Sequence, residues 1–73
     1  MIFSDGIHLV TDGDIGELHT FARKIGLKKK WFQDTRHPHY DLTTVKMTMK
    51  AILAGAKHVP PRELINHVAR RNQ

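Results

Sequence analysis

The fold of this chain is decided by the stretch Ile2-Phe3-Ser4-Asp5-Gly6-Ile7-His8-Leu9-Val10. Two short apolar runs flank Asp5-Gly6, the dipeptide most typical of a tight hairpin turn in which both central residues have positive φ. The stretch therefore predicts two antiparallel strands at the start of a sheet.

Two helices are expected after this hairpin, each ended by a glycine. Asp14 precedes the first and forms an Asp-x-x-Glu variant of the capping box with Glu17. Gly26 should end it as a left-handed residue. Thr43 can cap the second helix, which Gly55 should stop. The apolar positions of that second helix share one face, and they are Val45, Met49, Ile52 and Leu53.

A third helix begins at Pro61, which suits a first helical turn. It turns Leu64, Ile65 and Val68 inward and ends in the basic tail Arg70-Arg71-Asn72-Gln73. The aromatic run Trp31-Phe32-Gln33 predicts a buried strand, and Lys57-His58-Val59 predicts a further one. Because helices alternate with strands, we expect one α/β domain over residues 1–73, with a small mixed sheet, an N-terminal hairpin and three flanking helices.

The length and the absence of cysteine limit how this domain is stabilised. A chain of 73 residues buries only roughly 60% of the surface that its unfolded chain exposes. Without cysteine, neither disulfides nor thiolate zinc sites can add stability, so we expect a homo-oligomer. The sequence also has no apolar run of signal-peptide or membrane-span length, so we expect a cytoplasmic protein with no membrane partner.

The charge balance favours anionic partners. Twelve Lys and Arg residues against seven Asp and Glu residues give a formal net charge of +5 before any of the six histidines is counted. Such a surface attracts nucleotides, phosphates or nucleic acid.

Polar residues that can hold a ligand concentrate between Asp34 and Asp41. This segment leaves the predicted strand Trp31-Phe32-Gln33, and ligands of open α/β sheets bind beyond the carboxyl ends of strands. Arg36, His37 and His39 can form a cationic concavity for phosphate, although the chain has no Gly-rich phosphate loop. The candidate ligand-binding residues are Trp31, Asp34, Arg36, His37, His39, Tyr40, Asp41 and Arg62.

The same segment also permits a metal site. His37, His39 and Asp41 alternate, so in an extended backbone they face one side, as two histidines and a carboxylate do in many metal sites. Asp5 is a further candidate ligand. In the purely structural alternative, Asp41 caps the second helix, His39 bonds a carbonyl and Pro38 sets the bend.

The remaining histidines and lysines give weaker indications of function. Lys28-Lys29-Lys30 beside Trp31 could hold single-stranded nucleic acid, but lysines also complement a helix C-terminus and a lone Trp usually packs in a core. His8 either faces solvent or joins the site. His19, His58 and His67 are expected at the surface without a role.

The sequence resembles a short, uncharacterised family of bacterial and phage proteins, domain of unknown function 4031, recognised by a His-Tyr-Asp motif. The resemblance spans nearly the whole chain, and it implies no established activity. The family's opening strand usually ends in two aspartates before a longer loop, whereas this chain keeps only Asp5. A metal site that needs both aspartates is therefore not supported. Its clearest matches are Trp31-Phe32-Gln33, His37-Pro38-His39-Tyr40-Asp41-Leu42 and Ala54-Gly55-Ala56.

Three functions remain open, the third being nucleic-acid binding through Lys28-Lys29-Lys30. The first is a cofactor-free binding protein that holds a phosphate-bearing ligand, a nucleotide, through Arg36, His37 and His39, with Tyr40 or Trp31 stacking on it. Because the resemblance includes phage proteins, one version captures a host signalling nucleotide. The alternative is a phosphoesterase or nuclease that depends on a divalent metal. The sequence does not decide whether the protein is an enzyme.

Overall fold

The computed structural model describes residues 1–71, so the end of the basic tail lies outside the described residues. Its centre is a four-stranded sheet in the order β3-β2-β1-β4. β1 pairs antiparallel with β2 and parallel with β4, and β2 pairs antiparallel with β3. The small mixed sheet with an N-terminal hairpin is thus confirmed. The strands are β1 (Ile2–Ser4), β2 (His8–Thr11), β3 (Tyr40–Asp41) and β4 (Lys57–His58).

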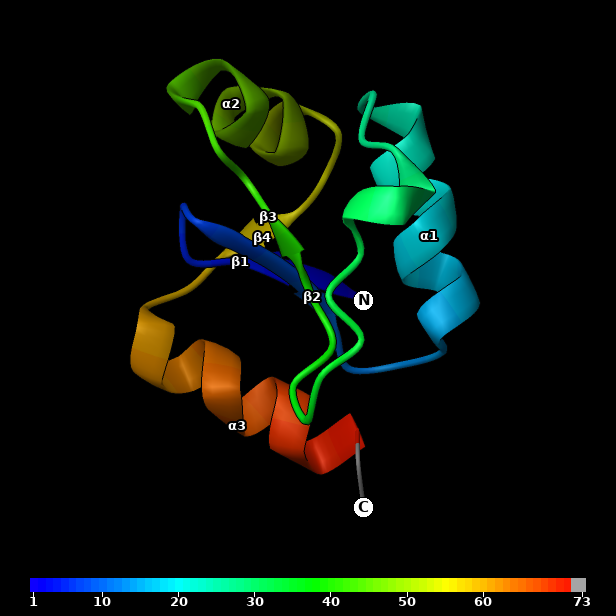
Figure 1. The fold of residues 1–73 in the computed structure, drawn as a ribbon. Coiled ribbons are helices and arrows are strands. Elements are labelled where there is room, and N and C mark those ends of the chain that lie inside the picture. The colour runs from blue at the N-terminus through cyan, green and yellow to red at the C-terminus, as the bar shows by residue number, and fades with distance from the viewer. Residues whose placement is uncertain (72–73) are drawn as a thin grey trace.

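Helices cover both faces of this sheet, and α2 and α3 lie on opposite sides of it in Figure 1. Side chains alternate between the faces, so the core has two parts. One cluster joins Leu9 and Tyr40 to residues of α1 and α2, and the other joins Phe3 and Val10 to Leu64 and Val68 of α3. The helices are α1 (Ile15–Lys24), α2 (Val45–Leu53) and α3 (Pro61–Arg71).

The predicted helix ends are confirmed. Gly26 and Gly55 have φ angles of 94° and 114°, a region that glycine enters without steric cost. After Gly26, the Leu27 N–H donates to the Ala22 carbonyl at 2.8 Å. After Gly55, the Ala56 N–H donates to the Ala51 carbonyl at 3.0 Å. Both helices therefore end in a Schellman motif.

The third helix begins at Pro61 as predicted, whereas the predicted cap of α2 is wrong by one residue. Thr44, not Thr43, caps α2, since its Oγ1 accepts the Met47 N–H at 3.1 Å. Asp41 cannot be that cap because it lies in β3. The Leu42 N–H donates to the Ile7 carbonyl, which keeps the chain extended past Asp41 and delays the helix.

The capping box and the hairpin turn also differ from the prediction. Asp14 makes no side-chain capping bond, and the Glu17 carboxylate instead accepts a hydrogen bond from the Thr11 hydroxyl at 3.3 Å. In the hairpin turn only Gly6 has positive φ. Asp5 shapes that turn with its side chain, because Oδ1 accepts the N–H groups of Ile7 and His8.

The predicted strand Trp31-Phe32-Gln33 is wrong. The chain forms a 3₁₀ turn, η1 (Lys29–Trp31), whose i→i+3 hydrogen bonds satisfy the backbone locally. The Trp31 side chain is 43% exposed rather than buried. Gln33 makes only an isolated bridge to His39. The loop from Asp34 therefore leads into the strand β3, whereas the sequence predicted that it leaves a strand ending at Gln33.

The apolar face expected on α2 exists, and it points to solvent. Val45 and Leu53 are 77% and 85% exposed, and Met49 and Ile52 are exposed as well. On α3, Ile65 is also exposed, so the prediction that it turns inward is wrong. Within the described part of the chain, no helix has the length and apolarity needed to cross a membrane.

Candidate metal centre

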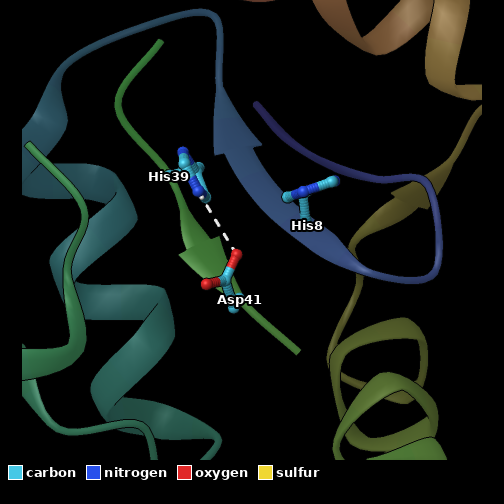
Figure 2. A group of neighbouring side chains, drawn as sticks. All are labelled: His8, His39 and Asp41. Atoms are coloured by element: carbon cyan, nitrogen blue, oxygen red, sulfur yellow. Dashed lines mark ion pairs between the residues drawn. The ribbon is translucent and has the colours of Figure 1, made fainter. Parts of the chain in front are cut away.

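His8, His39 and Asp41 gather on one face of the sheet (Figure 2). His39 directly precedes β3 and Asp41 lies in it, on either side of Tyr40, whose side chain belongs to the core on the opposite face. His8 on β2 is the register partner of Asp41. The pairing of β2 with β3 therefore brings a third donor to the two that alternate along the chain.

The spacing of these donors suits a metal ion. One ligand atom from each of the three residues lies within 4.8 Å of the others. His39 Nε2 is 3.2 Å from Asp41 Oδ1. Two ligands of a tetrahedral zinc ion, each about 2.0–2.2 Å from the metal, lie about 3.3–3.6 Å apart. The His8 donor atom lies within 4.8 Å of both, a separation that a bound ion would have to shorten.

Each histidine ring of the cluster has a hydrogen-bond partner at its Nδ1 atom. His39 Nδ1 is 2.7 Å from the His37 carbonyl oxygen, and His8 Nδ1 is 3.0 Å from Asp5 Oδ2. Such carbonyl and carboxylate partners fix the N–H on Nδ1 and turn the Nε2 lone pair outward in metal-binding histidines. The His39 ring is thus preset to offer Nε2, which lies 3.2 Å from Asp41 Oδ1, and Asp5 fixes the orientation of the His8 ring.

Asp5 is well suited to this supporting role. Its side chain is only 4% exposed. That burial alone would raise the pKa of the carboxyl, but hydrogen bonds from the His8 side chain and from the backbone N–H groups of His8 and Ile7 outweigh it and lower the pKa. Asp5 therefore stays a carboxylate that orients His8.

Two hollows adjoin the three donors. The first, about 150 Å³ and mostly apolar, lies between the sheet and α3 and is lined by His8, Val10, His37, His39, Leu64, Ile65 and Val68. The second, about 350 Å³, is called the Trp31 hollow below and is lined by Leu27, Lys30, Trp31, Gln33, Asp41, Thr43, Thr44 and Met47. Asp41 belongs to both the donor cluster and the Trp31 hollow.

The residues expected to form one phosphate site are dispersed. Asp34 and Arg36 are exposed on the loop and line neither hollow. The His37 ring lines the first hollow but is outside the donor cluster, to which it offers support only through its carbonyl. Arg62 lines a separate hollow at the start of α3.

Tyr40 is also placed differently from the expectation. It is 1% exposed, so no ligand can stack on it, and its hydroxyl is 2.7 Å from His19 Nδ1. Burial raises its pKa, against the opposing charge of Arg23. His19, expected at the surface without a role, thus has a structural one, and the side chain of His67 stacks on Phe3 and is only 13% exposed.

Among the proposed ligands, His8 is the one that sequence reasoning did not assign. The signal was its place on a strand between two apolar residues, which predicts a side chain on one face. Which other donors lie on the same face depends on the register between β2 and β3. That register joins segments far apart in the sequence, so the residues around His8 do not reveal it.

A family model described as "Protein of unknown function (DUF4031)" matches residues 5–71. The chain belongs to this family. No curated protein and no solved structure matches it. The match includes Asp5 and all three donors, whereas the DUF4031 description assigns them no activity. The function must therefore be argued from the chemistry of the site.

Proposed function

We propose that this protein is a metal-dependent hydrolase of phosphate esters, with His8, His39 and Asp41 as ligands of one divalent ion. The observation that carries the proposal is the cluster of three donor atoms within 4.8 Å of one another, behind which both histidines are oriented through Nδ1. Catalytic zinc sites commonly combine two histidines with one carboxylate and leave a coordination position for water. The metal would make that water a nucleophile near neutral pH.

The charge of the protein supports a phosphate ester as the substrate. The net charge is +5, and Lys30 lines the Trp31 hollow that borders Asp41. A bound divalent cation adds further positive charge where the reacting phosphoryl group would sit. The lack of cysteine supports a reducing compartment, so we place the activity in the cytoplasm, or in the host cytoplasm if a phage encodes the protein.

Metal-free phosphate capture by Arg36, His37 and His39 is the weaker proposal. In His39, Nδ1 bonds a carbonyl and Nε2 faces the Asp41 carboxylate. An anion placed there without a metal would meet a negative charge. With a metal ion bound between His39 and Asp41, the same carboxylate would act as a metal ligand.

The test combines metal binding with turnover. Chelator-treated protein is titrated with Co²⁺, whose visible absorption reports its coordination, and then assayed with bis(p-nitrophenyl) phosphate and p-nitrophenyl phosphate. We expect tight binding and hydrolysis of at least one ester, both abolished by His39→Ala and retained by the matched control His37→Ala. No binding at micromolar metal, or hydrolysis that survives chelation, would overturn the proposal.

A further inference from the structure

The Trp31 hollow contains the one tryptophan of the chain, in an unusual position for a small domain. Its side chain is 43% exposed at the end of the 3₁₀ turn η1. A large apolar ring left in solvent is costly unless something covers it. An exposed indole face is also a platform on which nucleobases stack.

Two lysines lie beside this platform. Lys28 Nζ lies 5.7 Å from the centre of the Trp31 ring, and Lys30 lines the hollow. The hollow also borders the start of α2, where the helix dipole favours negative charge. A ligand here should therefore carry a planar ring and an anionic group.

The size and position of the hollow define that ligand further. Its volume of about 350 Å³ lies in the range of about 300–1,000 Å³ that small-molecule sites occupy. Gln33 and Thr43 offer amide and hydroxyl groups for the edge of a base. Asp41, a proposed metal ligand, is one of the residues that line the hollow.

We propose that the Trp31 hollow binds the base of a nucleoside phosphate, stacked on Trp31, with its phosphate directed toward the metal at Asp41. This inference rests on the proposed function and names its substrate class. The first hollow is a poorer base site, because its volume of roughly 150 Å³ is less than half that of the Trp31 hollow and its only rings are histidines. The nucleoside phosphate can be a free nucleotide or the end of a single strand.

Trp31 itself reports occupancy, because no other tryptophan contributes fluorescence. Metal-loaded protein is titrated with AMP, with ribose 5-phosphate, which lacks the base, and with a short oligothymidylate. We expect AMP to quench Trp31 and to bind about tenfold tighter than ribose 5-phosphate, as one stacked base contributes. If the oligothymidylate binds more tightly than AMP, the natural ligand is the end of a single strand. If it binds more weakly than AMP, the natural ligand is a free nucleotide.

Variants locate the base by calorimetry. Trp31→Leu should lose about tenfold in AMP affinity and Trp31→Phe should recover most of it, since a phenyl ring still stacks. Ile65→Ser, in the first hollow, should bind AMP like the wild type. Co²⁺ spectra of all three variants should be unchanged.

Two results would overturn the inference while leaving the proposed function intact. One is equal affinity for AMP and ribose 5-phosphate, and the other is a loss of AMP binding in Ile65→Ser but not in Trp31→Leu. If no metal binds, the proposed function fails by itself. Quenching of the metal-free protein by adenosine, which carries no phosphate, still decides whether the base site exists.

Discussion

Asp5 links the fold to the proposed chemistry through a single side chain. Oδ1 accepts the backbone N–H groups that shape the hairpin turn, and Oδ2 contacts the His8 ring at 3.0 Å. In Asp5→Asn, Oδ1 can still shape the turn, but the amide gives His8 Nδ1 no anionic acceptor. We expect metal affinity to fall by about 10–100-fold, as is usual for loss of such a partner. Calorimetry measures this, and unchanged affinity would show that Asp5 does not orient a ligand.

The lowered pKa of Asp5 also predicts how the metal-free protein responds to acid. A carboxyl whose pKa is lower in the folded chain stabilises the fold fully above its ordinary value of 3.8. That stabilisation is lost as the pH falls through the folded pKa. Urea unfolding of the metal-free protein between pH 6 and pH 2.5 should therefore show a smaller acid loss for Asp5→Asn than for the wild type.

His67 offers a stability test away from the proposed site. Its ring stacks on Phe3, with centroids 3.8 Å apart, and neither ring nitrogen has a hydrogen-bond partner among the residues that the structure describes. The contact of Nε2 with Glu63 at 3.7 Å is too long for a hydrogen bond. His67→Phe keeps the stack and removes two unsatisfied buried nitrogens, so it should raise the free energy of unfolding by about 1–2 kcal/mol. Destabilisation measured by chemical denaturation would mean that these nitrogens are satisfied in solution.

Among the elements, α2 depends on Thr44 for its first turn. Its Oγ1 accepts the Met47 N–H, and loss of such a cap typically costs about 1 kcal/mol. Thr44→Ala should lower the free energy of unfolding by that amount. Thr44→Ser, which keeps the hydroxyl, is the matched control and should stay close to the wild type. Equal losses in both variants would refute the capping role.

The glycine helix ends and the strand at Lys57–His58 were predictable from the sequence, whereas the short strand β3 was not. Gly26 and Gly55 ended two helices as expected, because a left-handed residue is a local requirement. The short β3 was missed, since its two residues become a strand only by pairing with β2. The same pairing explains why His39 and Asp41 could be chosen as a donor pair from their alternation, whereas His8 could not be assigned with them.

For the whole molecule, the exposed face of α2 leads us to expect a homo-oligomer. Val45 and Leu53, with Met49 and Ile52, are left to solvent in a chain of 73 residues, and self-association would cover them. Sedimentation at micromolar concentration should give at least a dimer. Leu53→Lys should shift the protein toward the monomer without changing metal affinity. A wild type that sediments as a folded monomer would contradict this expectation.

The proposal that one metal ion binds between His8, His39 and Asp41 underlies the proposed activity. Its most direct test is calorimetric titration of Zn²⁺ into chelator-treated wild type, His8→Ala, His39→Ala and the control His37→Ala, at pH 7.5 and pH 5.5. We expect one site per chain, lost in the first two variants and kept in the control. Because protons compete for the ligating nitrogens, binding should weaken at the lower pH. Unchanged affinity in His8→Ala and His39→Ala, or tighter binding at pH 5.5, would contradict the account.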